Sequence, residues 1–296
     1  MAIYSYLQGG LGNQMFQYAI ARALSERYQV AFTLNRTWFD TPQECATPRQ
    51  LQLDLLKIKD IQFTSEPFPV KPNKLQRMLQ NIMPTGSLIY YQKNAFDFDP
   101  KILNIKRIHR RNLYLSGYWQ GYSYIKSIRI ALQQEFQTVS TISSAYQAYL
   151  QEINSTESVM VHIRRGDYVH SPAAAKIHGA LPLSYYLKAI QELVAKKPNA
   201  HFFIFSDDLP WAKQALPESI QKTFIENVPS SDVVAQELQL MFACKHHIIA
   251  NSSLSWWGAW LKQDLNGLVY TPDRWINDHT LELSNLLPSE WQRIST

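Results

Sequence analysis

The stretch Val159-Met160-Val161-His162-Ile163-Arg164-Arg165-Gly166-Asp167 decides the fold of this chain. Its first five residues form an apolar run, and a charged cluster follows at once. Two later stretches have the same form: residues 201–205 run into Ser206-Asp207-Asp208, and residues 247–250 run into Asn251-Ser252-Ser253. Short apolar runs of this kind predict buried strands. Helix-like stretches lie between them, and a β-α-β-α-β order is typical of a parallel sheet.

The ends of these predicted strands carry most of the polar chemistry of the chain. Ligands of parallel sheets bind beyond the carboxyl ends of the strands. The residues found there are two arginines, three aspartates and two serines: Arg164, Arg165, Asp167, Asp207, Asp208, Ser252 and Ser253. This inventory predicts a site for an anionic ligand that has a hydrogen-bonding head group.

The length and composition favour two globular domains. The chain has 296 residues, of which 46% are hydrophobic and 18% charged, and this is a core-forming composition. We expect an N-terminal domain over 1–156, a second domain over 157–275, and a tail over 276–296 that packs back on the body as a helix. The net charge of +5 is a mild basic bias. The one basic run, 107–111, is typical of a solvated face, so we expect no nucleic-acid partner.

Cysteines and hydropathy bear on the cellular context. The two cysteines, Cys45 and Cys244, are far apart, which excludes a disulfide framework and a cysteine-rich zinc site. Residues 1–8 lack a basic signal region, and no window of about 18 uncharged apolar residues exists, so we expect no membrane span. The expected location is the cytoplasm, with peripheral association at the inner membrane face left open.

A glycine-rich turn follows the first predicted strand, Ile3 to Leu7. The turn is Gly9-Gly10-Leu11-Gly12-Asn13, and helical spacing runs from about Gln14 to Tyr28. A strand, a glycine loop and a helix in this order can bind an anion. The loop matches neither the dinucleotide fingerprint, because Met15 replaces the third glycine, nor a P-loop. A tight turn that needs only glycine torsions is an equally good interpretation.

Each strand-end cluster also has a simpler structural explanation. Two arginines can clamp a phosphate, but neighbours on a strand point to opposite sides, and Asp167 could merely hold one of them. Asp207 and Asp208 could bind a divalent metal. Alternatively, one of them caps the helix that begins near Leu209, and the other accepts hydrogen bonds from a ligand. The serines could bind phosphate or serve only as caps.

Four stretches together resemble one family. They are residues 9–17 (GGLGNQMFQ), 161–168 (VHIRRGDY), 205–208 (FSDD) and 251–261 (NSSLSWWGAWL). In this order they resemble the motifs of the α-1,2-fucosyltransferases of glycosyltransferase family 11. Because no membrane anchor is expected, the chain looks more like a bacterial member of that family. The His-x-Arg-Arg-x-Asp element is shared more widely with α-1,6- and protein O-fucosyltransferases. The first and last stretches are found in a narrower set of proteins, so they are the more specific motifs.

The resemblance implies a fold, a reaction and its substrates. It implies an α/β, GT-B-like architecture with two Rossmann-like domains that face a central cleft. The N-terminal domain would face the acceptor, and the C-terminal domain would hold GDP-fucose. The reaction would be inverting transfer of L-fucose from GDP-β-L-fucose to the 2-OH of a terminal galactose of an oligosaccharide. No metal or other cofactor would take part.

The resemblance also implies roles for individual residues. Arg164 would contact the β-phosphate, with Arg165 beside it. His162 and either Asp207 or Asp208 would approach the guanine. The remaining implied substrate-binding residues are Asn251, Ser252 and Ser253 near the diphosphate, and Gly10, Gly12, Asn13 and Gln14 from the N-terminal domain.

The general base is open at this stage. Related fucosyltransferases have a glutamate after the Arg-Arg-x-Asp element, whereas this chain has Tyr168-Val169-His170-Ser171-Pro172. Asp167 is the first candidate, as the carboxylate nearest to Arg164 in sequence. His178 is the second, because a loop from Tyr168 to Leu181 could swing over the site. A third possibility is that no side chain acts as base and a phosphate oxygen takes the proton late. Two alternatives to the whole interpretation are a metal-dependent transferase with another nucleotide sugar and a non-catalytic nucleotide- or glycan-binding protein.

Overall fold

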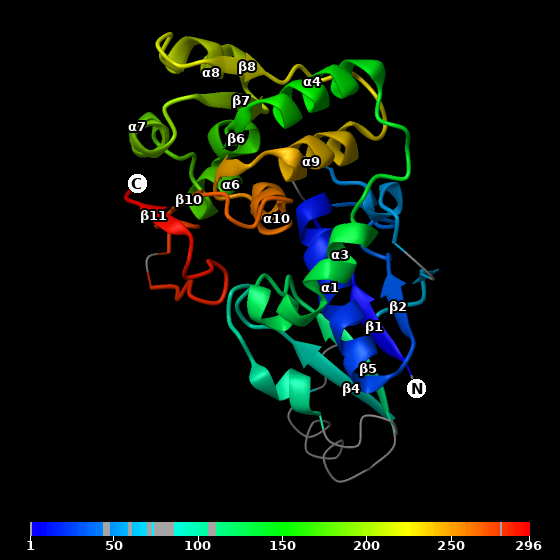
Figure 1. Ribbon diagram of the computed structural model, residues 1–296. Coiled ribbons are helices and arrows are strands. Elements are labelled where there is room, and N and C mark those ends of the chain that lie inside the picture. The colour runs from blue at the N-terminus through cyan, green and yellow to red at the C-terminus, as the bar shows by residue number, and fades with distance from the viewer. Residues whose placement is uncertain are drawn as a thin grey trace. The chain divides into compact units, whose positions relative to one another are not determined.

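The chain folds into two compact α/β units (Figure 1). The computed structural model describes all residues except 1, 44–47, 59–60, 70–72, 74–85, 106–110 and 279. Unit 1 comprises Met1–Phe136 with Glu282–Leu286, and unit 2 comprises Gln137–Leu281 with Leu287–Thr296. Cys45 and most of the basic run at 107–111 lie outside the described residues.

Unit 1 is built on a parallel sheet. Its strand order is β3-β2-β1-β5-β4. The strands are β1 (Ile3–Tyr6), β2 (Phe32–Asn35), β3 (Gln62–Thr64), β4 (Gly86–Tyr91) and β5 (Arg111–Ser116). The helices are α1 (Leu11–Tyr28) and α3 (Arg129–Glu135), with single turns η1 (Leu53–Leu55), η2 (Pro100–Asn104), η4 (Tyr122–Tyr124) and η5 (Lys126–Ile128).

Alternation along β1 separates the two faces of this sheet. Ile3 and Ser5 are fully buried, and the Ser5 hydroxyl donates to the backbone carbonyl of Gln17 in α1 at 2.8 Å. Tyr4 points to the other face, where its ring stacks on Tyr114 of β5 at 4.6 Å. Successive side chains of a strand face opposite ways, so α1 covers the first of these faces.

The glycine turn is shorter than expected. Helix α1 begins at Leu11 rather than near Gln14, so Gly12 and Asn13 lie in its first turn. Gly9 has a φ of +80°, in the left-handed region that favours glycine. Gly10 is the N-cap, and its carbonyl accepts from the backbone N–H of Gln14 at 3.1 Å. The earlier start follows from this cap, which the sequence pattern of apolar residues does not reveal.

Unit 2 contains a second parallel sheet, with strand order β11-β10-β9-β6-β7-β8. The strands are β6 (Glu157–Ile163), β7 (Ala200–Ser206), β8 (Lys222–Phe224), β9 (His246–Ile248), β10 (Val269–Pro272) and β11 (Gln292–Ile294). The helices are α4 (Ser144–Ser155), α5 (Gly166–His170), α6 (Pro172–Ile177), α7 (Leu183–Lys196), α8 (Leu209–Ala215), α9 (Val233–Ala243) and α10 (Ser253–Trp260). The three apolar runs singled out in the sequence are therefore β6, β7 and β9 or its continuation.

Helices cover both faces of this sheet. On one face, Val159, Val161 and Ile163 of β6 join a core that also contains buried residues of α7 and of α8. On the other face, a side chain added at Gly258 of α10 would meet Met160 and the α9 residue Met241, both within 3.4 Å. A larger residue at position 258 would therefore crowd both methionines, and α10 packs closely over the Met160 side of β6.

The strand order places the ends of β6, β7 and β9 next to one another. β6 lies between β7 and β9, with Ile163 opposite Ser206 and Val161 opposite Ile248. From β6 the chain proceeds to β7 and β8 on one side, and it then returns to β9, β10 and β11 on the other. The gap between β6 and β9 is thus a topological switch point, where open α/β sheets bind their ligands.

The limits of the units differ from the boundaries expected from sequence. Helix α4 packs on α9 and on β6, so unit 2 begins at Gln137, well before residue 156. In the tail, the described part of 276–296 contains turns and the short strand β11 but no helix. Residues 282–286 belong to unit 1, and Pro288 cannot continue a helix.

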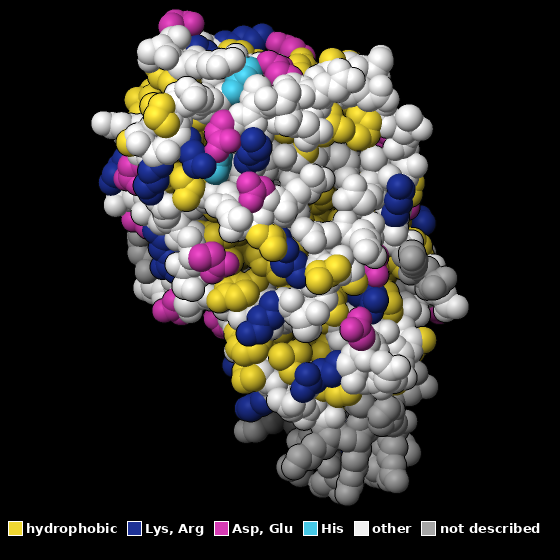
Figure 2. Space-filling view, in the orientation of Figure 1, with side chains coloured by type: hydrophobic (Ala, Val, Ile, Leu, Met, Phe, Trp, Pro, Cys, Tyr) yellow, Lys and Arg dark blue, Asp and Glu magenta, His cyan; other side chains and the backbone are white. Residues whose placement is uncertain are grey.

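The visible face of the molecule carries charges of both signs. Figure 2 shows Lys and Arg side chains interspersed with Asp and Glu on the visible face rather than gathered in one field. Among the described helices, none combines the length and the apolar character that a bilayer crossing demands.

Candidate active site

Arg164 is the central cation at the carboxyl end of β6. Its Nη2 lies 2.6 Å from Oδ1 of Asp167, and its Nη1 lies 2.8 Å from Oδ2 of Asp207. One carboxylate comes from the next helix, α5, and the other from the end of the neighbouring strand, β7. The side chain is 25% exposed. Two carboxylates thus fix the plane of the guanidinium while part of it stays accessible.

Arg165 points toward a different helix. Its backbone N–H donates to Oδ1 of Asp207 at 2.7 Å, and its Nε donates to Oδ2 of Asp208 at 3.1 Å. Its guanidinium carbon lies 4.0 Å from the ring centroid of Trp211 in α8, within the range of a cation–π contact. As expected for neighbours at a strand end, the two arginines have different surroundings.

The two aspartates after β7 also differ. Asp208 is the N-cap of α8, and its Oδ1 accepts from the backbone N–H of Trp211 at 3.2 Å. Asp207 caps no helix, and both of its oxygens bind the Arg164–Arg165 segment. A side chain added at Gly166 would lie 2.6 Å from Oδ2 of Asp207, so glycine leaves room for this carboxylate. Helix capping by one aspartate, one of the two sequence interpretations, is confirmed.

His162 is a buried neutral imidazole beside these charges. It is 7% exposed, and its Nδ1 is buried with no hydrogen-bond partner among the described residues. Burial lowers the pKa of His162 to about 4, an effect larger than the opposing one of Asp207, and Arg164 lowers the pKa further. The ring is therefore uncharged near neutral pH, and its Nδ1 has no hydrogen-bond partner among the described residues.

The segment after β9 leads into the first turn of α10. Ser252 is the N-cap, but its hydroxyl makes no capping hydrogen bond. Ser255 instead donates to the carbonyls of Ala250 and Ser252, at 3.2 and 3.1 Å. Ser252 and Ser253 are both partly exposed. The first turn of a helix has N–H groups without intrahelical partners, so this end of α10 has donors for an anion.

Tyr168 connects the β6 and β9 ends across the switch point. Its hydroxyl donates to the carbonyl of Asn251 at 3.2 Å, and the Arg164 guanidinium lies 5.6 Å from its ring centroid. On this ring the imidazole of His178 stacks nearly parallel, with centroids 4.8 Å apart. The structure therefore brings His178 together with Arg164 and Asp167.

The segment expected to swing as a loop is instead helical and tethered. It contains α5 and α6, and five consecutive carbonyls, from Ala175 to Gly179, accept hydrogen bonds from two asparagines. Asn277 donates from its side chain to residues 175 and 176, at 2.9 and 3.0 Å, and from its backbone to residue 177. The side chain of Asn251 donates to residues 178 and 179, both at 3.2 Å. These bonds hold His178 in place.

The electrostatic surroundings keep His178 neutral. Burial lowers the pKa of His178 below its ordinary 6.5, while Asp167 opposes this shift and Arg164 adds to it. Its Nδ1 is buried without a partner among the described residues. A neutral imidazole can accept a proton at pH 7, whereas the Asp167 carboxylate is already engaged with Arg164.

In unit 1, the expected contact residues have unequal exposure. Gln14 is fully buried, and its amide makes four hydrogen bonds to backbone groups of Gly9, Gln50, Gln52 and Leu53. It therefore shapes the turn from inside. Gly12 is buried in the first turn of α1, whereas Asn13 is partly exposed and a side chain added at Gly10 would meet no atom within 4 Å.

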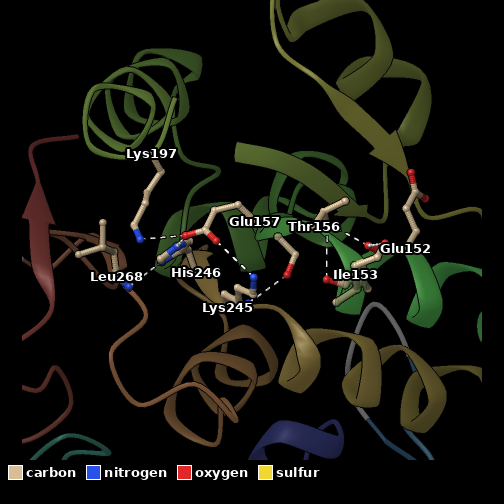
Figure 3. Close-up of polar contacts among 10 residues, drawn as sticks. Glu152, Ile153, Thr156, Glu157, Lys197, Lys245, His246 and Leu268 are labelled. Carbon is tan, nitrogen blue, oxygen red and sulfur yellow. Dashed lines mark hydrogen bonds and ion pairs between the residues drawn. The ribbon is translucent and has the colours of Figure 1, made fainter. Parts of the chain in front are cut away.

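The histidine pair His246-His247 lies at the end of the unit 2 sheet opposite to Arg164, and both side chains make structural hydrogen bonds. The Nε2 of His247 bonds the Met241 carbonyl at 2.8 Å, and burial lowers the pKa of this imidazole to about 3. His246, Lys197 and Lys245 converge on the carboxylate of Glu157 at the start of β6 (Figure 3). Hydrogen bonds from His246 first, and then from the lysines, lower the pKa of Glu157 to about 2.

Each of the two units is an α/β domain built on a parallel sheet, and this is the architecture of the GT-B-like glycosyltransferases. The NodZ α-1,6-fucosyltransferase from Bradyrhizobium, in crystals soaked with GDP-fucose, shares the fold with a TM-score of 0.52 at 16% identity. That match covers 88% of this chain and 92% of NodZ. POFUT1 in complex with GDP gives a TM-score of 0.54 at 13% identity, over 91% of this chain and 97% of POFUT1.

The chain belongs to glycosyl transferase family 11, whose family model matches residues 69–294. An α-1,2-colitosyltransferase of Escherichia coli is 32% identical over 99% of this chain and 98% of that protein. The O-antigen biosynthesis glycosyltransferase WbnK of E. coli is 32% identical over 93% of this chain and 95% of that protein. The galactoside 2-α-L-fucosyltransferase Sec1 of Mus musculus is 24% identical over 49% of this chain and 41% of its own length. The resemblance seen in the sequence motifs is thereby confirmed, and the protein is a glycosyltransferase of the fucosyltransferase type.

Proposed function

We propose that this enzyme transfers L-fucose from GDP-β-L-fucose to the 2-OH of a terminal galactose of an oligosaccharide, forming an α-1,2-fucoside with inversion. The observation that carries the proposal is the oriented guanidinium of Arg164 at the switch point of the unit 2 sheet, held by Asp167 and Asp207. Breaking the sugar–phosphate bond places negative charge on GDP. A fixed guanidinium and the N-terminus of α10 would stabilise that charge without a metal.

The charge balance of the cluster suggests how the donor enters. Without a ligand, two guanidinium groups face three carboxylates, a sum of −1. A diphosphate therefore cannot simply be added to Arg164. We infer that Asp207 leaves Nη1 of Arg164 to the β-phosphate and turns to accept N–H groups of guanine. Asp208 stays at the cap of α8, holding Arg165 as a support rather than as a phosphate ligand.

Guanine recognition would also involve His162. Its unpartnered Nδ1 can bond a polar atom of the base, and its neutrality at pH 7 avoids repulsion with Arg164. The serine hydroxyls at the start of α10, together with its free N–H groups, would bind the diphosphate. The side chain of Asn251 would act indirectly, because its amide nitrogen is committed to backbone carbonyls.

For the general base we propose His178 in place of Asp167. The short bond of Asp167 to Arg164 supports an orienting role for this carboxylate. His178 is neutral, held rigidly and close enough to both residues for their charges to act on its pKa. A base must be within hydrogen-bond reach of the acceptor hydroxyl and unprotonated at working pH, and His178 meets the second condition.

From unit 1, Gly10, Gly12 and Asn13 would contribute to substrate binding, with Gln14 shaping the turn. Gly10 leaves open space for a ligand, and Asn13 has a partly exposed amide. These assignments agree with the position of the turn at the end of β1, which is a switch point of its own sheet, between β1 and β5.

A second candidate donor is a colitose nucleotide, because one relative of nearly full-length coverage is named a colitosyltransferase. Colitose differs from fucose by the absence of the 3-hydroxyl. A site that hydrogen-bonds this hydroxyl discriminates strongly against the deoxy sugar, because the unmatched polar groups stay buried.

A donor panel tests the proposal. The purified enzyme is assayed with GDP-fucose, GDP-colitose, GDP-mannose and UDP-galactose against lactose, with and without EDTA. We expect GDP-fucose to be preferred and EDTA to have no effect. Preference for GDP-colitose would make the protein a colitosyltransferase, loss in EDTA would indicate a metal-dependent reaction, and binding without turnover for every donor would contradict catalysis.

A further inference from the structure

The amide of Asn13 is fixed in one orientation by a residue far away in sequence. Nε2 of Gln120 donates to Oδ1 of Asn13 at 2.7 Å. Gln120 follows β5 and is only 8% exposed, whereas Asn13 lies in the first turn of α1. Because Oδ1 is taken, the other end of the amide, the Nδ2 donor, must point away from Gln120.

Gly9 makes room for that donor. A Cβ atom built on Gly9 would lie 2.7 Å from Nδ2 of Asn13, closer than real contacts allow. Gly9 also has a φ of +80°. Glycine is therefore favoured at position 9 both by this backbone conformation and by the close approach of Asn13. Nδ2 makes no hydrogen bond to the residues that the structure describes. The amide is thus held between Gln120 and Gly9, with two N–H groups available.

Gln120 is itself firmly held. Its backbone N–H donates to the carbonyl of Ala95 at 2.9 Å, and the backbone N–H of Tyr122 donates to Asn285 at 3.0 Å. Trp119, the preceding residue, is 2% exposed and has a φ of +54°, an unfavourable conformation for a tryptophan. Such backbone strain is kept only where the surroundings enforce it, and it occurs often at ligand sites.

We propose that Gln120 is a positioning residue that presents the Nδ2 donor of Asn13 to an oxygen atom of a substrate. This inference rests on the proposed function in that Asn13 binds substrate. The oxygen belongs either to the donor diphosphate or to a sugar hydroxyl. Both are hydrogen-bond acceptors, and binding measurements distinguish them.

Gln120→Glu is the decisive variant, because a carboxylate can only accept. It would draw Nδ2 of Asn13 toward position 120 and turn Oδ1 to the substrate oxygen. Gln120→Met keeps the volume but leaves the amide free to rotate. We expect kcat/KM to fall at least about tenfold in Gln120→Glu and less in Gln120→Met. Gln62→Glu, on the exposed edge strand β3, is the charge-matched control.

A double-mutant cycle separates positioning from a structural role. In an Asn13→Ala background, Gln120→Glu should lower kcat/KM no further, and thermal melting should show that each variant folds. A further loss in that background would overturn the inference, as would wild-type kcat/KM in Gln120→Glu. If Asn13→Ala alone keeps wild-type activity, the proposed substrate contact of Asn13 fails instead, and the inference fails with it. Weaker GDP binding by Gln120→Glu would identify a phosphate oxygen, and a raised KM for the acceptor would identify a sugar hydroxyl.

Discussion

Nη1 of Arg164 lies 2.8 Å from Oδ2 of Asp207, so the cation at the end of β6 is bound by the carboxylate at the end of β7. The pairing follows from the register, because Ile163 is opposite Ser206 in adjacent parallel strands. Under the proposed function, a phosphate that binds Nη1 of Arg164 would replace this carboxylate. This pair therefore links donor entry to a local rearrangement of two side chains.

Replacement of Arg164 should abolish transfer. Arg164→Ala removes the cation that we propose stabilises the leaving GDP, and we expect kcat/KM to fall by at least about 100-fold. Arg164→Lys should recover little, because an ammonium cannot make the same pair of N–H contacts. The exposed Arg293→Ala on β11 is the matched control. Retention of more than about a tenth of the activity in Arg164→Ala would refute the assigned role, since the lost stabilisation would be under roughly 1.4 kcal/mol.

The two aspartates should respond differently to the same change. Asp207→Asn should weaken GDP binding while leaving ADP binding nearly unchanged, because its carboxylate is the proposed acceptor for guanine N–H groups. Asp208→Asn should keep the preference for GDP. Calorimetric titration of both variants with GDP and ADP measures this difference. An unchanged GDP-to-ADP ratio in Asp207→Asn, with loss of the ratio in Asp208→Asn, would reverse the assignment.

The pH dependence of catalysis should identify the base. The pKa of His178 lies below 6.5, so the fraction of neutral imidazole rises as pH increases through that pKa and then stays constant. We expect kcat/KM to be flat above pH 6.5 and to fall only as the pH decreases through the lowered pKa of His178. His178→Gln should lose about 10²- to 10⁴-fold in rate. His170→Gln, an exposed neighbour in α5, should retain activity. Wild-type kcat/KM in His178→Gln would overturn this assignment.

Much of this site could be predicted from the sequence because of how parallel sheets are built. Apolar runs that end in polar residues mark strand ends, and neighbouring parallel strands bring those ends to one edge. The proximity of Arg164 to Asp207 follows from this rule alone. Local spacing likewise supports capping of the helix near Leu209 by one of the two aspartates, and the structure identifies that residue as Asp208.

The supporting contacts could not be predicted, because they join residues with no common pattern. The bonds from Asn277 to the carbonyls of α6 and from Gln120 to Asn13 each span about a hundred residues. The tail was expected to be helical because its leucines recur, but Leu283 and Leu286 are buried and the segment Glu282–Leu286 belongs to unit 1. Tertiary packing, rather than local propensity, determines the secondary structure of such segments.

Acid sensitivity of unit 2 should depend on Glu157. Its pKa of about 2 lies below the ordinary 4.5, so its stabilising effect is complete above pH 4.5 and is lost as pH falls toward 2. Glu157→Gln should therefore destabilise the fold at pH 7 by about 1 kcal/mol, a value that allows for solvent screening, and the difference from wild type should shrink below pH 4.5. Chemical denaturation at pH 7, 4 and 3 measures this. Glu218→Gln, whose side chain is 93% exposed, is the control, and an equal effect of both variants would contradict the account.

The product itself tests the central claim most directly. The enzyme is incubated with GDP-β-L-fucose and lactose, and the purified product is examined by NMR for its anomeric configuration and its linkage. Inverting transfer at the site around Arg164 predicts an α-L-fucosyl residue on O2 of galactose. A β-fucoside, a linkage to another hydroxyl, or fucose released without any transfer to lactose or another galactose-terminated acceptor would contradict the proposed reaction.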